Sequence, residues 1–436
     1  MHAYRAKVKA ALVGVNLRVA VAFWLFGLIN NIFYVIILSA ALDLVGPSIP
    51  KATVLLSSII PGLATKIVVP YVIHLIPYSA RVIILAILST CGMLTVALSP
   101  SHTTSGIAAK VAGIVLANIS SGAGEVHFLA LTHFYGTTSL AAWGSGTGGA
   151  GLLGAGAYAL ATTTLGVSVQ STLLSSAVIP VGMVLSFFSL LPLDPLTAGE
   201  HKIPNYEAVP GEDNDHEIIT EERAGLLDQP EAQHSSPAYQ HNSHSSLQQL
   251  FHDLKIKLSR AKTLVIPYML PLFLVYVAEY TINQGVAPTL LFSLDSTPFK
   301  HYRAFYPTYG AIYQLGVFIS RSSLPFVRIR TLYVPSILQV VNLTALMIHA
   351  MYPYIPSVWF VFAIIFWEGL LGGLVYVSTY AAVREEVPDA DREFSLGAVT
   401  VSDSGGIFVA GLLGVVMESS LCSWQVAHGR DWCRRL

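Results

Sequence analysis

The sequence predicts an all-α membrane protein that crosses the bilayer about eleven times, in two similar halves. The first observation is composition: 53% of the 436 residues are hydrophobic and only 11% are charged, with a mean hydropathy of +0.61. A soluble chain carries about 25% charged residues. The second is the recurrence of apolar stretches of about 20 residues, the length at which a helix spans a bilayer.

The expected spans follow from the apolar stretches in chain order. The first follows a basic N-terminus, but its length and its Asn30-Asn31 pair favour a retained span over a cleaved signal peptide. The eleven spans are expected at 18–41, 52–74, 81–99, 106–131, 139–165, 170–191, 263–292, 303–322, 331–351, 355–381 and 394–418.

A polar stretch separates the sixth span from the seventh. Residues 192–262 are rich in Pro, Glu, Asp, His, Ser and Gln, which predicts a mostly disordered loop. Its end, 247–262, has the apolar and basic pattern of an amphipathic helix on the bilayer surface. The expected domains are a six-helix half (1–191), this loop (192–262), a five-helix half (263–418) and a tail (419–436).

The distribution of Lys and Arg favours a cytosolic N-terminus and a cytosolic central loop. Eleven spans then place the C-terminus on the other side, although Arg430, Arg434 and Arg435 favour the cytosol. Within the central loop, the acidic dileucine pattern of Glu222, Leu226 and Leu227 fits a sorting signal, a pattern that also arises by chance.

Three motifs recur about 250 residues apart, in the manner of an internal duplication. Asn30 in the first span matches Asn283 in the seventh, the glycine-rich stretch 145–154 matches 402–414, and 121–124 matches 370–373. A six-plus-six duplication that lacks its twelfth helix is the architecture of a major-facilitator transporter.

Four acids, Glu125, Glu279, Glu368 and Asp403, fall within the apolar part of expected spans, and Glu125 lies in an apolar run from about Ile107 to Leu131. A charged side chain at a helix centre costs about 2.5–3.5 kcal/mol on insertion. Glu125 is therefore expected to face other helices or a water-filled cavity. The alternative is a packing helix in which Glu125 is neutral and bonded to a neighbour.

The seventh span carries a polar stripe. Tyr276, Glu279, Tyr280 and Asn283 share one helical face, which suits a polar substrate or a proton site. A hydrogen-bonded seam between helices is the alternative.

Lys66 is the only clear base within the spans. An acid paired with it is expected to be structural, whereas an unpaired acid is expected to exchange protons. The sequence leaves the pairing open. The candidate substrate- or proton-binding residues are Glu125, Glu279, Asn283, Gln284, Asn30, Tyr34, Lys66, His127, Tyr276, Glu368 and Asp403. Arg321 is a candidate gate residue, with an anchor at the membrane surface as the alternative.

The chain resembles the battenin family. The resemblance rests on ISSGAGE (119–125), SGTGGAGLLG (145–154), AEYTINQG (278–285), SRSS (320–323), EGLLGG (368–373) and REF (392–394), and it covers essentially all the spans. It implies a major-facilitator-type protein of the lysosomal or vacuolar membrane. The family is linked to vacuolar pH balance, to basic amino acid handling and to clearance of glycerophosphodiesters.

The expected function is export of a small polar solute, with protons, membrane lipids and sorting adaptors as further partners. The alternative is a non-transporting scaffold that regulates vacuolar pH or trafficking through the central loop. The chain is not expected to be an enzyme, because it lacks G-x-S-x-G, H-E-x-x-H and metal-ligand spacings. No cofactor and no nucleic acid partner is expected, and the net charge of −1 gives no basic footprint.

Overall fold

The computed structural model describes residues 16–40, 51–100, 104–196 and 255–435. The expected sorting residues Glu222, Leu226 and Leu227, and most of the expected central loop, lie outside the described residues. Across the described ranges every regular element is a helix, which confirms the predicted all-α class.

The first group of helices precedes residue 197. Its members are α2 (Leu17–Ser39), α4 (Lys51–Val72), α5 (Tyr78–Leu98), α6 (Thr104–Ala159), α7 (Val169–Ser176) and α8 (Ile179–Leu185). Helix α6 contains a bend at Gly136, whose φ of 82° and ψ of −172° are not helical. Glycine tolerates a positive φ because it has no Cβ. The two arms of α6 are therefore two separate spans, as the sequence predicts.

The second group follows residue 254. Its members are α11 (Leu270–Thr281), α12 (Phe305–Ser322), α13 (Tyr333–Met351), α14 (Val358–Glu386) and α15 (Asp389–Ala427). The chain is already helical at residue 255, and Lys255–Thr289 forms one long apolar segment. Residues 255–262, assigned from sequence to a surface helix, thus continue into the seventh span. Helix α15 also runs past the expected end of the last span at 418.

Nine helical segments of the described chain are long and apolar enough to cross a membrane, and Ser105–Thr162 contains both arms of α6. Helix α12 is not among the nine because one of its faces is polar, with Tyr313, Gln314 and Arg321. With both arms of α6 and with α12, eleven helices of the described residues can span the bilayer, which is the expected number.

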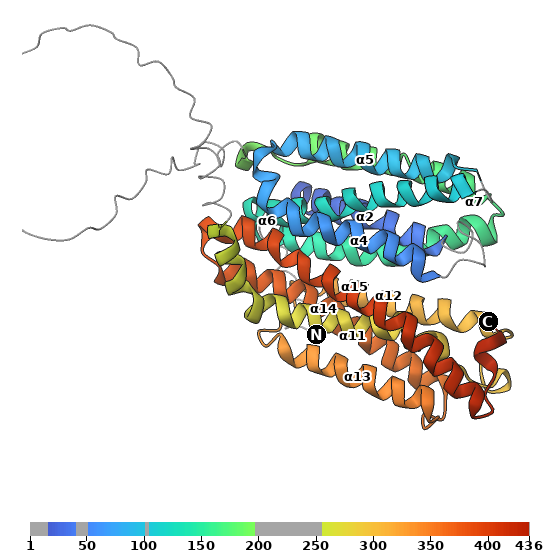
Figure 1. Ribbon diagram of the computed structural model, residues 1–436. Helices are drawn as coiled ribbons and strands as arrows, with labels where there is room; N and C mark the ends of the chain where they lie inside the picture. Colours follow the sequence, from blue (N-terminus) through green and yellow to red (C-terminus); the bar gives the residue numbers. More distant parts are fainter. Residues whose placement is uncertain (1–15, 41–50, 101–103, 197–254, 436) are drawn as a thin grey trace, which may run out of the picture.

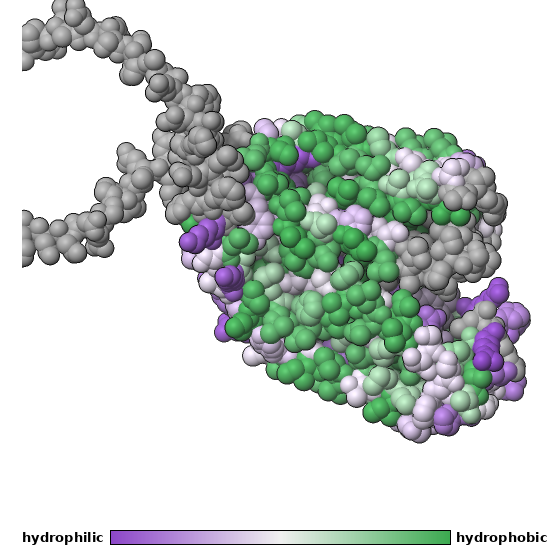
Figure 2. Space-filling model, viewed as in Figure 1, coloured by the Kyte–Doolittle hydropathy of each residue, from purple (hydrophilic) through white to green (hydrophobic). Residues whose placement is uncertain are grey.

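The two groups lie side by side as two packed layers (Figure 1). Contacts of α4 with α15, α6 with α12 and α6 with α15 join them. The visible outer surface is largely hydrophobic across both layers (Figure 2). On α13, for example, Val334, Ile337 and Val341 are 55%, 57% and 55% exposed. Side chains of this kind suit contact with lipid.

Each group contains a close contact between two helices at a glycine: α6 with α2 in the first group, and α15 with α11 in the second. A Cβ on Gly146 would overlap the backbone of Trp24 in α2, and one on Gly406 would lie 2.8 Å from the carbonyl oxygen of Phe273 in α11. Small residues allow helix backbones to approach closely in membranes. These contacts support the interpretation of the matching stretches 145–154 and 402–414 as parts of two similar halves.

The C-terminal residues are held against the end of the second group. Cys422 and Cys433 form a disulfide, with their Cα atoms 5.8 Å apart. The ring of Trp432 stacks on Tyr302, with the ring centres 6.0 Å apart. Two cysteines eleven positions apart do not by themselves reveal that a turn brings them together, so this bond is not predictable from the sequence.

Candidate functional site: a charged cavity between the two helix groups

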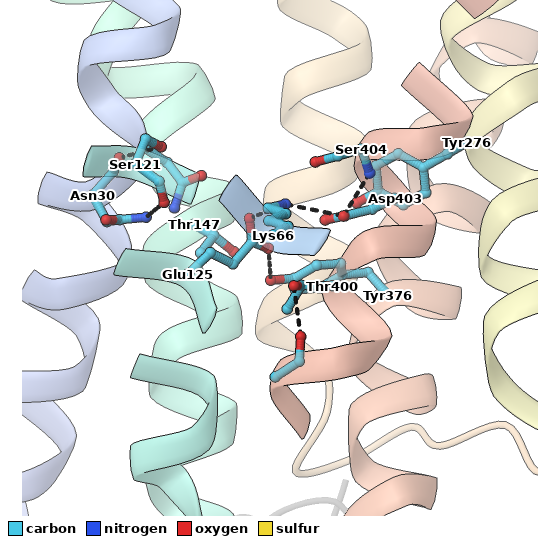
Figure 3. A network of polar contacts seen from close by, with 12 residues as sticks. Asn30, Lys66, Ser121, Glu125, Thr147, Tyr276, Tyr376, Thr400, Asp403 and Ser404 are labelled. Carbon is cyan, nitrogen blue, oxygen red and sulfur yellow. Dashed lines mark hydrogen bonds and ion pairs between the residues drawn. The ribbon is translucent and has the colours of Figure 1, made fainter. Parts of the chain in front are cut away.

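An ion triad joins the two groups of helices. The Nζ atom of Lys66 on α4 lies 2.6 Å from Oε2 of Glu125 on α6 and 3.0 Å from Oδ1 of Asp403 on α15. The side chains of Lys66, Glu125 and Asp403 are 5%, 10% and 6% exposed (Figure 3). Two of the four acids within the spans are therefore paired with Lys66, which resolves the pairing that the sequence left open.

Hydrogen bonds complete the environment of the two acids. Oε1 of Glu125 accepts a hydrogen bond of 2.9 Å from the hydroxyl of Tyr376, and that hydroxyl accepts one of 3.1 Å from Nε1 of Trp143. The backbone N–H of Ser404 donates to Oδ1 of Asp403 at 2.6 Å. A buried ion pair offsets the loss of hydration only when its remaining polar atoms also find partners.

Arg321 is partly buried and contacts α6 and α11. Its Nη1 donates to Oγ1 of Thr147 at 2.8 Å, and its Nη2 donates to the hydroxyl of Tyr276 at 2.9 Å. The guanidinium also lies 4.1 Å from the centre of the Tyr376 ring, the geometry of a cation–π contact. These contacts favour the gate role over the surface anchor considered from the sequence, and the gate role stays a prediction.

These side chains line a cavity of about 120 Å³ between the two groups. For comparison, an apolar cavity of about 150 Å³ admits a benzene-sized molecule. The stacked rings of Tyr276 and Tyr280, with centres 5.8 Å apart, form part of its wall. The lining combines charged groups with phenols and amides: Lys66, Glu125, Arg321, Asp403, Tyr34, Tyr276, Tyr280, Tyr313, Tyr376, Asn31, Asn118 and Gln314.

The other two acids form a separate cluster within the second group. Glu279 on α11 and Glu368 on α14 are 1% and 0% exposed. The hydroxyl of Tyr313 donates to Oε1 of Glu279. Nδ2 of Asn283 donates to Oε1 of Glu368 at 3.2 Å and to the carbonyl oxygen of Glu279 at 3.1 Å. Neither carboxylate lines the cavity, whereas Tyr313 does.

The polar stripe of the seventh span is thus divided between two environments. Tyr276 and Tyr280 face the cavity, while Glu279 and Asn283 contact α12 and α14. Positions i, i+3, i+4 and i+7 cover a broad strip of a helix surface, so its two edges meet different neighbours.

Three further candidates do not line the cavity. Nδ2 of Asn30 donates to the carbonyl oxygen of Ser121 at 3.0 Å, and the Ser121 hydroxyl donates to the carbonyl oxygen of Asn30 at 2.9 Å, so Asn30 fastens α2 to α6. Gln284 packs against Gly414. His127 is fully buried, and its ring centre lies 4.8 Å from that of Phe128.

Sequence reasoning missed Tyr376, Trp143, Thr147, Tyr313 and Gln314. A signal for the last two existed, because Tyr313, Gln314 and Arg321 form the polar face of a span that is otherwise apolar. Tyr376 and Trp143 carry no comparable signal, since aromatic residues are ordinary members of apolar runs.

A second set of contacts joins the groups at one end of the molecule. The hydroxyl of Tyr78 on α5 donates to Oε1 of Glu393 on α15 at 2.6 Å. Nη1 of Arg384 on α14 donates to the carbonyl oxygen of Thr132 on α6 at 2.7 Å. These bonds join the two groups at that end in the conformation described.

Two packed groups of membrane-spanning helices with a charged cavity between them define a membrane protein with the major-facilitator fold. Solved structures share this fold. The chain superposes on the proton:xylose symporter XylE with a TM-score of 0.58 at 11% identity, covering 96% of this chain and 91% of that one. For the human organic anion transporter MFSD10 the TM-score is 0.54 at 12% identity, covering 95% of each chain. Identities this low show the fold alone.

Residues 21–424 match the family model described as CLN3 protein. The chain is 58% identical to Protein btn1 of Aspergillus fumigatus over 432 residues, covering 98% of this chain and 93% of the relative. It is 54% identical to Protein btn-1 of Neurospora crassa over 444 residues, covering 99% and 94%. The chain therefore belongs to the CLN3 family, the battenin family that its motifs resemble.

Proposed function

We propose that this protein transports a small polar solute, of the basic amino acid or glycerophosphodiester class, across the vacuolar or lysosomal membrane and thereby contributes to vacuolar pH homeostasis. The observation that carries the proposal is the ion triad of Lys66, Glu125 and Asp403 in a cavity between the two helix groups. Charged residues at membrane depth mark substrate and ion pathways. The solute class and the location rest on the resemblance to the battenin family.

The cavity offers groups of both charges to a solute. A carboxylate or phosphate would compete with Glu125 and Asp403 for Lys66, or bind Arg321, whereas an ammonium or guanidinium would compete with Lys66 for the two acids. The phenols and amides of the lining supply hydrogen bonds to hydroxyl groups.

Replacement of an ion-pair partner by solute would connect binding to motion. The Lys66–Asp403 pair links α4 of the first group to α15 of the second. A solute that takes the place of either partner weakens this link and favours the conformation in which the groups separate. Differential affinity for two conformations is what allows a ligand to shift their populations.

The C-terminal disulfide supports a luminal C-terminus, because disulfides persist in oxidising compartments. Eleven spans then leave the N-terminus and the central loop in the cytosol, in agreement with the distribution of Lys and Arg. In this orientation the end joined by Tyr78 and Glu393 faces the cytosol.

The test is uptake into liposomes that contain the purified protein, with an imposed pH gradient and a panel of arginine, lysine and glycerophosphodiesters. Saturable uptake of one solute is expected, and Asp403→Asn is expected to abolish it. Asp389→Asn is the matched control, since the side chain of Asp389 is 79% exposed. If folded protein took up none of the solutes in the panel, the proposal would be contradicted. If deletion of residues 197–254 then abolished vacuolar pH control in cells, the scaffold function would replace it.

A further inference from the structure

We propose that Glu279 and Glu368, together with Asn283, form a proton-binding site that is separate from the charged cavity and through which a pH gradient drives transport. The inference rests on the proposed transport function and assigns its coupling ion to named residues. It concerns the cluster inside the second helix group, where no solute is expected to enter.

The first argument is burial without a cation. Glu279 and Glu368 are 1% and 0% exposed, and neither takes part in an ion pair of the described residues. By contrast, Glu125 and Asp403 share Lys66. Burying an unpaired ionised carboxylate costs far more than burying its neutral form, so such groups are neutralised. A proton is the ligand that neutralises a carboxylate in so confined a place.

The second argument is the interaction of two like charges. Glu279 is the charged group that acts on Glu368, and Asn283, one helical turn after Glu279, donates to Oε1 of Glu368 and to the backbone carbonyl of Glu279. Two carboxylates that share a site do not readily ionise together, because their repulsion is weakly screened away from water. The second oxygen of each, Oε2, is buried and has no hydrogen-bond partner. These two atoms are available to carry a proton.

The remaining surroundings do not replace a counter-ion. Arg321 is the cation that acts on Glu279 at longer range, but its guanidinium is already bonded to Thr147 and Tyr276. Glu368 is fully buried, and the charged group that acts on it is Glu279, another acid. The titratable and charged groups that face Glu279 are Tyr313 and Arg321 on α12, Glu368 on α14, and Tyr276 and Tyr280 on its own helix.

The third argument is a route for the proton. Tyr313 lines the cavity, and its hydroxyl donates to Oε1 of Glu279. A phenolic hydroxyl both accepts and donates, so one side chain connects the water of the cavity with the acid. Because Tyr313 forms part of both sites, a change in the charge of Glu279 also changes the wall of the solute cavity.

The position of Glu279 is fixed by α14. A Cβ on Gly372 would lie 2.6 Å from Cδ of Glu279, so the carboxyl group packs directly on the helix backbone at this glycine. The site is thus built by α11, the residues 282–286 that follow it, α12 and α14, all in the second helix group. It is distinct from the triad, which bridges the two helix groups.

The test compares two measurements in proteoliposomes for Glu279→Gln and Glu368→Gln. Net uptake under a pH gradient is expected to fall by about 5–150-fold, the range of coupling between linked sites. Exchange of labelled for unlabelled solute at equal pH is expected to remain, because it needs no net proton movement. Glu418→Gln is the control, since Glu418 is an exposed acid on α15. Asp403→Asn, in the solute cavity, is expected to abolish both measurements.

A second measurement does not depend on the solute. Infrared difference spectra between low and high pH are expected to show the carbonyl band of a protonated carboxyl group in the wild type. The band is expected to be lost in the Glu279→Gln, Glu368→Gln double variant. Glutamine has the shape of protonated glutamate, so these variants are expected to fold, and Tyr313→Phe provides a third variant that leaves both acids in place.

Uptake by Glu279→Gln and Glu368→Gln that responds to the pH gradient like the wild type would overturn the inference. An unchanged carboxyl band in the double variant, or wild-type uptake driven by a sodium gradient instead, would overturn it equally. Absence of both exchange and uptake in the wild type would contradict the transport function, and the infrared measurement would still decide whether the site binds protons.

Discussion

Lys66 and Asp403 are 337 positions apart in the chain, yet a 3.0 Å ion pair joins them across the boundary between the two helix groups. With Glu125 at 2.6 Å, the buried cation has two anionic neighbours, one from each group. The triad therefore contributes both to the packing of the groups and to the chemistry of the cavity, and its two contributions can be separated by substitution.

Lys66→Met is expected to destabilise the protein by about 3–5 kcal/mol, because it leaves two buried acids without their partner. The triple variant Lys66→Met, Glu125→Gln, Asp403→Asn is expected to recover much of this loss, since no uncompensated charge remains. Thermal unfolding in detergent measures both. A triple variant less stable than Lys66→Met would contradict this account of the triad.

The hydrogen bond between Tyr78 and Glu393 is expected to keep one end of the cavity closed. Tyr78→Phe removes a bond to a charged group, worth about 1.5–3 kcal/mol. Ser58 lines the cavity, so a Ser58→Cys substitution reports access to it. This cysteine is expected to react faster with a membrane-impermeant maleimide from the cytosolic side when Tyr78→Phe is present than when Tyr78 is kept. The experiment uses a Cys91→Ser background.

Tyr333→Phe is the matched control for this labelling. The hydroxyl of Tyr333 donates to the carbonyl oxygen of Ile266, so this bond lies within the second group and does not join the two groups. Equal labelling rates in Tyr78→Phe and Tyr333→Phe would show that the Tyr78 bond does not hold the closed end.

The glycine contacts predict equivalent effects in both halves. Gly146→Val and Gly406→Val each place a side chain against the backbone of a neighbouring helix and are expected to destabilise the protein by about 1–3 kcal/mol or more. Gly156→Val is the control, because a Cβ there meets no atom within 4 Å. Unfolding temperatures compare the three. If Gly146→Val lowered the unfolding temperature and Gly406→Val did not, the two halves would not be packed equivalently.

The positions of the spans could be predicted because bilayer thickness fixes the length of an apolar helix. The four acids could be selected because a charge in an apolar run is costly and needs a reason. The partner of each acid could not be predicted from the sequence. Whether Lys66 meets Asp403 or Glu279 depends on how α4 and α15 are rotated and how close they pack, and neither is encoded in local spacing.

Arg321 illustrates a second limit. It follows the apolar part of α12, at the end of the expected span 303–322, which suggests an anchor at the membrane surface. Side chains on a helix point back toward its N-terminus, so an arginine in the last turn reaches into the bundle. Its contacts with Thr147 and Tyr276 also come from α6 and α11, which the sequence of α12 does not reveal.

The C-terminal disulfide predicts the side of the membrane on which the chain ends. In intact vacuoles, Cys422 and Cys433 are expected to be shielded from an impermeant thiol reagent even after reduction with a membrane-permeant reductant, and to react once the membrane is opened. Cys422→Ser is expected to lower stability by about 2–4 kcal/mol. Labelling in intact vacuoles after reduction would place the C-terminus in the cytosol and contradict the proposed orientation.

Arg321→Lys separates the charge of Arg321 from its geometry. The guanidinium donates to Thr147 and to Tyr276 from two different nitrogens while it lies over the Tyr376 ring. A lysine keeps the positive charge but lacks the planar fork, so it is expected to lose at least one charged hydrogen bond, worth about 1.5–3 kcal/mol. Solute transport is expected to fall although the protein stays folded.

Arg328→Lys is the matched control for that substitution. The ion pair of Arg328 with Glu385 lies near the surface, with side chains 31% and 50% exposed, and exposed pairs contribute only about 0.2–1 kcal/mol. Arg328→Lys is therefore expected to transport like the wild type. If Arg321→Lys also did so, charge alone would suffice at this position, and the contacts with Thr147 and Tyr276 would have no part in gating.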